Sequence, residues 1–147
     1  MEIKEHMRTY DKCYKEQDDF YQKAADYAGL SDAGFWIMYR LCQDEKSCLQ
    51  SELSQEWCFS KQTINSAVVK LKDCGYVMLE AISGGGNRKA LTLTPEGRRF
   101  CNKKIVPVIR AEEKSFEGLT EEERETLIRL MKKQLEILYR EMENIWQ

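Results

Sequence analysis

The chain has 147 residues, of which 42% are hydrophobic and 33% are charged, which fits one domain with a core of its own. No apolar run approaches the roughly 20 residues of a membrane span, and the polar N-terminus has no signal-peptide pattern, so we expect a cytoplasmic protein without membrane contact. With six cysteines, no C-x-x-C pair and one histidine, we expect small buried thiols rather than disulfides or a zinc site.

The net charge of −2 hides an uneven distribution. Residues 60–104 contain nine Lys/Arg against three Asp/Glu, a local charge of +6, whereas the rest of the chain contains 14 against 22, or −8. The basic charge is concentrated in one segment, which favours nucleic acid as a partner of that segment.

The first two predicted helices are rich in aromatic residues. Residues 3–30 place apolar side chains, Tyr14 and Tyr21 among them, at helical spacing. This amphipathic helix packs either on its own domain or on a second copy, and both readings stay open. Ser31 or Asp32 begins the next helix, whose Phe35, Trp36 and Tyr39 favour a core role, with one wall of a ligand pocket as the alternative.

Residues 47–75 are predicted to form a helix, a turn and a second helix. Ser47 and Gln50 fit an S-x-x-Q capping box that starts the first helix. Ser60 is a good N-cap for the second helix, and Gly75 supplies a left-handed stop. One face of the second helix is apolar, with Ile64, Ala67, Val68 and Leu71.

The opposite face of the second helix carries short polar groups. Gln62, Asn65, Ser66 and Val69 lie there, flanked by Lys61, Thr63, Lys70 and Lys72. Amides and hydroxyls exchange hydrogen bonds with base edges, and lysines neutralise phosphates. This face therefore indicates DNA contact, with a merely solvated face as the alternative.

A glycine-rich hairpin is predicted next. Residues 76–82 and 90–94 have strand character, and residues 83–89 join them. Asn87, Arg88 and Lys89 lie at the tip, which suits a wing that contacts the DNA backbone or minor groove.

The C-terminal third is predicted to be helical. A helix begins at Thr94-Pro95-Glu96, and Pro107 either interrupts or bends it. Gly118 ends it, before Thr120 and Glu123 form another capping box. The last helix repeats a heptad seam that favours a two-fold dimer, formed by Ile128, Met131, Leu135, Leu138, Met142 and Ile145.

Three runs carry a family resemblance: residues 60–71 (SKQTINSAVVKL), Gly75-Tyr-Val, and residues 91–97 (LTLTPEG). Together they resemble the MarR family of bacterial winged helix-turn-helix regulators, over almost the whole chain. The resemblance implies a mainly α fold with a small β-hairpin wing, in a single domain 1–147. Residues 31–94 would be the DNA-binding part, and residues 1–30 and 95–147 the dimerisation helices. The family's wing often carries an Asp two residues before an Arg, which is missing from Gly84-Gly-Gly-Asn-Arg88.

The function implied is a sequence-specific, homodimeric regulator of transcription, a ligand-responsive repressor on a pseudo-palindromic operator. Its partners would be double-stranded DNA, a second copy and a small aromatic or phenolic effector near Phe35, Trp36 and Tyr39. The DNA-binding residues would be Ser60, Lys61, Gln62, Thr63, Asn65, Ser66, Val69, Lys70, Asn87, Arg88 and Lys89. Tyr14 and Tyr21 would join the heptad seam at the dimer interface.

Other functions remain open beside this one. The same fold with Cys13 as a reactive thiol would be a redox-sensing regulator, and a winged-helix module that binds protein instead of DNA is a third reading. Because the sequence has no Ser/His/Asp set, no phosphate loop and no metal cluster, we expect neither enzyme activity nor a cofactor or metal.

Overall fold

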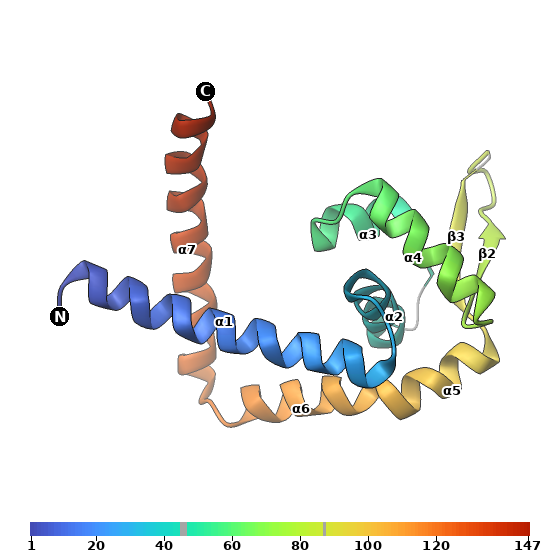
Figure 1. The fold of residues 1–147 in the computed structure, drawn as a ribbon, viewed down its shortest axis with the longest axis horizontal. Helices are drawn as coiled ribbons and strands as arrows, with labels where there is room; N and C mark the ends of the chain where they lie inside the picture. Colours follow the sequence, from blue (N-terminus) through green and yellow to red (C-terminus); the bar gives the residue numbers. More distant parts are fainter. Residues whose placement is uncertain (45–46, 87) are drawn as a thin grey trace. The chain divides into compact units, whose positions relative to one another are not determined.

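The computed structural model describes residues 1–44, 47–86 and 88–147, which form a mainly helical protein with a small antiparallel sheet, as the sequence predicts. The helices are α1 (Ile3–Ala28), α2 (Asp32–Asp44), α3 (Gln50–Trp57), α4 (Lys61–Asp73), α5 (Pro95–Lys104), α6 (Val106–Glu117) and α7 (Glu121–Trp146) (Figure 1). The strands are β1 (Cys48–Leu49), β2 (Val77–Ala81) and β3 (Lys89–Leu93). The chain divides into two compact units, Met1–Ile109 and Arg110–Gln147.

Helix α2 is the centre of the first unit. Alanine, aromatic and aliphatic residues on all its sides are buried, and it packs against α1, α4 and α5. A helix that is apolar around its circumference is stable only inside a core, so the other helices form around this one. The fully buried members are Phe35, Ile37, Met38 and Leu41.

The sheet has the order β1-β3-β2, with both pairs antiparallel. The predicted hairpin is confirmed as β2–β3, in which Val77 pairs with Leu93 and Ala81 with Lys89. Strand β1 was not predicted. Its Cys48 pairs with Leu91, and both side chains are buried.

The helix expected to begin at Ser47 begins at Gln50 instead, so the predicted Ser47–Gln50 capping box is wrong. Extended backbone at Cys48 and Leu49 pairs with β3 and buries the Cys48 side chain, which a helix from Ser47 would prevent. The Glu52 carboxylate caps the shorter helix by accepting the Leu49 N–H at 2.8 Å.

The first helix ends at Ala28 rather than at residue 30, because Gly29 takes a left-handed conformation, with a φ of 70°. The remaining predicted helix boundaries are confirmed. The hydroxyls of Ser31, Ser60 and Thr94 accept the N–H groups of the third residue onward, at 3.0 to 3.1 Å. Gly75 has a φ of 77°, and the break between α5 and α6 precedes Pro107. Gly118 follows the last residue of α6.

The expectation about the cysteines is wrong. Cys42 and Cys101 form a disulfide, with their Cα atoms 6.2 Å apart. Because 59 residues separate them, only the packing of α2 against α5 brings them together, and no local spacing indicates the pair. Cys13, Cys58 and Cys74 are exposed, so among the free cysteines only Cys48 is the buried thiol that was expected.

The second unit holds the end of α6 and helix α7. Thr120 and Glu123 form the predicted capping box, in which each side chain bonds the other residue's backbone N–H. The Arg124 guanidinium donates to the carbonyls of Phe116 and Leu119 at 2.9 and 2.6 Å, which closes the turn between the helices. Among the described residues, no helix is both long and apolar enough to cross a membrane.

Candidate nucleic-acid interface

Helix α4 presents one face to solvent because the other is buried. Its apolar stripe is almost fully inaccessible and consists of Ile64, Ala67, Val68 and Leu71. Helices α2 and α3 pack against α4. The predicted division of this helix into two faces is therefore confirmed, and the polar face has a fixed orientation.

The outward face carries unengaged polar groups. Gln62, Asn65 and Ser66 are exposed, and within 1–44, 47–86 and 88–147 their side chains form no hydrogen bond or ion pair. Val69, 49% exposed, adds an apolar contact on the same face. Ser60 and Thr63 differ, because their hydroxyls bond each other at 2.8 Å. The amides and the Ser66 hydroxyl are thus available to a ligand that lies along the helix.

Cationic groups flank this face. Lys61, Lys70 and Lys72 are exposed, and none of them forms an ion pair within the described part of the chain. Helix α4 has one acidic residue, Asp73, which is its last residue. Over the residues that the structure describes, this surface is therefore positive and not neutralised by ion pairs, which suits a polyanion.

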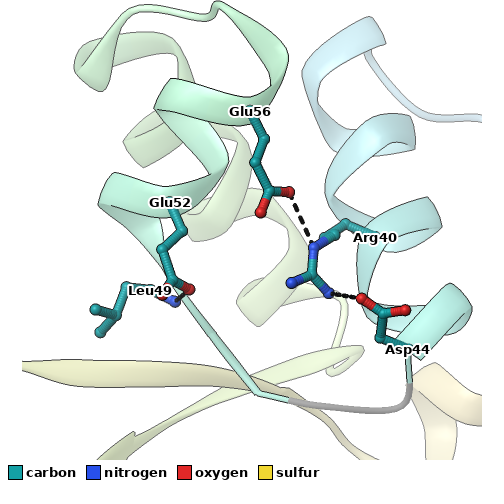
Figure 2. A network of polar contacts seen from close by, with 5 residues as sticks. All are labelled: Arg40, Asp44, Leu49, Glu52 and Glu56. Carbon is teal, nitrogen blue, oxygen red and sulfur yellow. Dashed lines mark hydrogen bonds and ion pairs between the residues drawn. The ribbon is translucent and has the colours of Figure 1, made fainter.

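An ion-pair network holds α3 against α2 (Figure 2). The Arg40 guanidinium donates from Nε to Glu56 Oε2 at 2.9 Å, and its Nη1 lies 2.7 Å from Asp44 Oδ2. Burial acts to lower the pKa of Arg40, but the hydrogen bond and charge of Glu56, helped by Asp44, outweigh it and raise that pKa. Arg40 therefore remains a cation that fixes the first helix of the helix-turn-helix.

The turn between α3 and α4 is short and specific. Cys58 ends α3 with a left-handed φ of 55°, a conformation that residues other than glycine seldom adopt. The Ser54 hydroxyl donates to the Phe59 carbonyl at 2.6 Å. These features set the angle at which α4 leaves α3. The predicted turn at Cys58 and Phe59 is confirmed.

The hairpin β2–β3 lies beside α4 at one end of this unit (Figure 1). Its tip is closed by backbone hydrogen bonds from Gly85 to Ile82 at 3.0 Å and from Arg88 to Gly85 at 3.2 Å. Arg88 and Lys89 are exposed cations there, while the predicted contact residue Asn87 lies outside the described residues. The hairpin thus adds a second positive surface next to α4.

The base of the hairpin is held against α5 by a hydrogen bond and by ring stacking. The Thr94 N–H donates to the Tyr76 carbonyl at 3.0 Å, and the rings of Tyr76 and Phe100 stack with centroids 4.3 Å apart. Gly97 lies so close to Tyr76 that a Cβ would be 1.9 Å from that carbonyl oxygen. Sequence reasoning noted the Thr-Pro-Glu-Gly run but missed this close approach, and it missed the Arg40 network entirely.

Solved structures resemble the chain in fold. Neither the models of known protein families nor the curated protein sequences match it. A MarR family regulator from Neisseria meningitidis superposes with a TM-score of 0.77 at 17% identity, over 98% of this chain and 99% of that one. S. aureus MepR, in a complex with DNA, gives 0.71 at 14% identity over 88% and 94%. A Mycobacterium tuberculosis MarR family protein in complex with salicylic acid gives 0.53 at 25% identity over 77% and 83%.

The chain has the MarR family's winged-helix fold. In this MarR fold, α3 and α4 form the helix-turn-helix and β2–β3 forms the wing. The residues predicted to bind DNA, Asn87 aside, thereby come to the outward face of α4, its N-cap and the tip of the wing.

The aromatic residues predicted to line an effector pocket lie mostly in the core of the MarR fold. Phe35 is fully buried and Tyr39 nearly so. Trp36 is half-buried between Tyr21 and Trp57, with ring centroids 4.9 and 4.6 Å away. The residues form one cluster, and only Trp36 among the three predicted has appreciable exposure.

The residues predicted to form a dimer interface remain largely uncovered in the single chain. Tyr14 is 58% exposed, whereas Tyr21 packs partly against Trp36. On α7 the seam residues are exposed except Met142, which is half-buried. The apolar stripe that the sequence predicted therefore faces solvent on this helix.

Proposed function

We propose that this protein is a sequence-specific DNA-binding regulator of transcription. The observation that carries the proposal is the outward face of α4. There Gln62, Asn65 and Ser66 are exposed, and within the described residues they are unengaged and lie between lysines that form no ion pair. A helix with this face suits the major groove, where amides pair with base edges, while Lys61, Lys70 and the wing cations contact phosphates.

Relatives in fold support the proposal. S. aureus MepR has this fold and is seen with DNA. The fold alone does not carry the function across such low sequence identity, so the proposal rests on the chemistry of α4. Ser60 and Thr63 serve chiefly to begin the helix, and Thr63 reaches the backbone of the DNA beside Lys61.

The active form is a homodimer. The exposed apolar seam of α7 and the exposed Tyr14 support a second copy as the partner, because a soluble chain seldom leaves such a stripe uncovered. Residues 1–30 and 95–147 then serve dimerisation, and residues 31–94 bind one half-site each. A two-fold dimer places its recognition helices in successive major grooves, about 34 Å apart.

A small aromatic anion regulates DNA binding, so that the protein is a repressor released by its ligand. The M. tuberculosis protein of this fold binds salicylic acid. In this chain the Trp57 indole N–H is shielded from solvent without a hydrogen-bond partner among the described residues, and Trp36 stacks on that ring. Salicylate should quench tryptophan fluorescence and release DNA. A Trp36→Phe variant that still responds fully would argue against this site.

The direct test is a mobility shift with duplexes from the region upstream of the chain's own coding sequence. We expect one duplex to shift at nanomolar protein and to survive competition by random DNA. Equal competition by any DNA would leave only non-specific binding, and no shift at low salt would favour the protein-interaction module. Cys13→Ser should bind as the parent does, with and without peroxide; a peroxide response lost in that variant would favour the Cys13 redox reading.

A further inference from the structure

The disulfide between Cys42 and Cys101 joins two helices that meet at the DNA-binding part. Cys42 lies in the last turn of α2, and Cys101 lies in α5. Their Cα separation of 6.2 Å is within the range that a disulfide spans without backbone movement. The bonded pair therefore fits the packing of α2 against α5.

The remaining cysteines indicate that this disulfide is reversible rather than permanent. Cys13, Cys58 and Cys74 are exposed and free. Exposed free thiols persist where the surroundings keep thiols reduced, and in such surroundings a disulfide is usually transient or redox-sensing rather than permanent. Cys48 is also free but buried, and burial, reinforced by Glu52 and Glu56 against Arg40, raises the pKa of its thiol to about 11. Cys48 is thus an inert thiol.

The two sulfurs of the pair differ in access. Cys42 is half-buried, whereas Cys101 is only 2% exposed. A small oxidant therefore reaches Cys42 first, and the buried Cys101 is the thiol that then reacts with the oxidised Cys42. This arrangement of an accessible and a resolving cysteine is typical of redox-sensing pairs.

We propose that Cys42 and Cys101 form a reversible thiol–disulfide couple that responds to hydroperoxides. The Cys42 thiolate attacks one peroxide oxygen, breaking the O–O bond to give a sulfenic acid, and the leaving alkoxide takes up the Cys42 proton as an alcohol. The Cys101 sulfur then attacks the Cys42 sulfur, forming the S–S bond and expelling hydroxide, which leaves as water with the Cys101 proton. Two thiols and one hydroperoxide give one disulfide, one alcohol and one water.

The couple is placed to affect the helix-turn-helix. Bonded sulfurs lie about 2 Å apart, but unbonded ones need roughly 3.5 Å or more, so reduction moves the two sulfurs apart at the point where α2 packs against α5. Two residues before Cys42, Arg40 ties α2 to Glu56 of α3 (Figure 2). Four residues before Cys101, Gly97 packs on the base of the wing. The effect on DNA rests on the proposed function, whereas the thiol chemistry does not.

The test begins with thiol counting on the full chain. The protein is reduced with dithiothreitol, desalted, and treated with one equivalent of cumene hydroperoxide. We expect the six thiols to fall to four, with the missing pair mapped to Cys42 and Cys101 by non-reducing mass spectrometry. Loss of Cys13 or Cys58 instead, or a reduced protein that is unfolded by circular dichroism, would overturn the proposal.

Two variants assign the roles of the cysteines. Cys101→Ala, an apolar change suited to a buried position, should accumulate a sulfenic acid that dimedone labels at Cys42. Cys42→Ala should show no labelling at Cys101. Cys74→Ser is the matched control, because Cys74 is free and exposed, and it should behave as the parent does. Labelling of Cys101 in Cys42→Ala would overturn the order of attack.

The DNA arm compares reduced and oxidised protein on the same upstream duplex. We expect the two Kd values to differ at least threefold, and the difference to vanish in Cys42→Ala. A smaller difference in the parent would overturn the coupling to DNA. If neither form binds any duplex, the proposed function fails, and the thiol counts still decide the redox chemistry.

Discussion

Gly97 is a residue whose identity follows from contact with backbone alone. It lies in the first turn of α5, where its N–H donates to the Thr94 hydroxyl at 3.0 Å. The Tyr76 carbonyl oxygen occupies the place of its absent side chain. Because that carbonyl also accepts the Thr94 N–H, it is not free to move away.

We expect Gly97→Ala to lower the free energy of unfolding by about 1–3 kcal/mol, the usual cost of forcing an extra carbon into a packed site. Urea titration followed by circular dichroism measures it. Gly118→Ala is the control, since a Cβ there meets its nearest atom at 3.4 Å, an ordinary contact. If the two substitutions lowered the free energy of unfolding equally, α5 could move away from Tyr76 without destabilising the fold, and the account of Gly97 would be wrong.

The lysines of α4 should contact phosphates. Lys61→Ala or Lys70→Ala should weaken binding to every DNA sequence, because phosphate contacts carry no sequence information. The slope of log K against log salt should flatten by about one unit for each lost contact. Titration at four salt concentrations measures the slope. An unchanged slope would mean that these lysines face solvent in the complex.

Helices α2 and α3 are joined by a polar tie that the sequence did not indicate. Arg40 is 16 residues from Glu56, and only the packed pair of helices brings them together. Its side chain is 17% exposed, whereas both acidic partners are more than 40% exposed. In these ion pairs the Arg40 side chain is therefore largely shielded from water, whereas the two carboxylates remain solvated.

We expect Arg40→Ala to lower the free energy of unfolding by about 1–2 kcal/mol. A hydrogen bond to a charged group is stronger than a neutral one, but solvent partly screens the carboxylates of Asp44 and Glu56 that Arg40 contacts. Lys23→Ala breaks the 2.7 Å ion pair with Asp19, whose two side chains are 71% and 58% exposed, and should cost less than about 0.5 kcal/mol. Thermal unfolding of both variants compares them. Similar losses would mean that burial of Arg40 adds nothing.

Among the elements, helix ends and the two faces of α4 were predictable from local chemistry. Ser60, Thr94 and Thr120 cap helices as predicted, because a cap depends on neighbours within three residues. The predicted Ser47 cap was wrong because the start of α3 depends on a distant contact: β1 pairs with β3 across more than 40 residues. Local signals cannot include such a contact.

At the scale of the whole molecule, the winged helix was predictable because its motifs lie in one stretch of 48 residues, 47–94. The disulfide was not, since it depends on α2 becoming the centre of the core. The core role favoured for Phe35 is confirmed, because aromatic density is a local signal. Six cysteines allow many pairings, and spacing does not choose among them.

The seam of α7 should hold the dimer together. Replacing Leu135 and Leu138 with Glu places two charges on the apolar stripe, so the variant should sediment as a 17.3 kDa protomer and lose operator binding. Lys133→Glu changes the charge of α7 by the same two units on the side of the helix opposite the seam, and should leave the dimer intact. A dimer that persisted in the leucine variant would move the interface elsewhere.

The central claim is that the outward face of α4 reads DNA sequence, and Asn65 tests it most directly. Its amide is exposed and unengaged within the described residues, so it can pair bidentately with adenine, a contact worth roughly 1–3 kcal/mol of discrimination. Asn102→Ala, which removes an exposed amide of α5, is the matched control.

The decisive measurement is the affinity of Asn65→Ala for operator and for random DNA at one salt concentration. Operator binding should fall roughly 5- to 150-fold, the equivalent of that pairing energy, while random-DNA binding stays within about twofold because the phosphate contacts remain. Asn102→Ala should match the parent on both DNAs. Equal losses on the two DNAs would contradict the claim, because Asn65 would then only position the backbone.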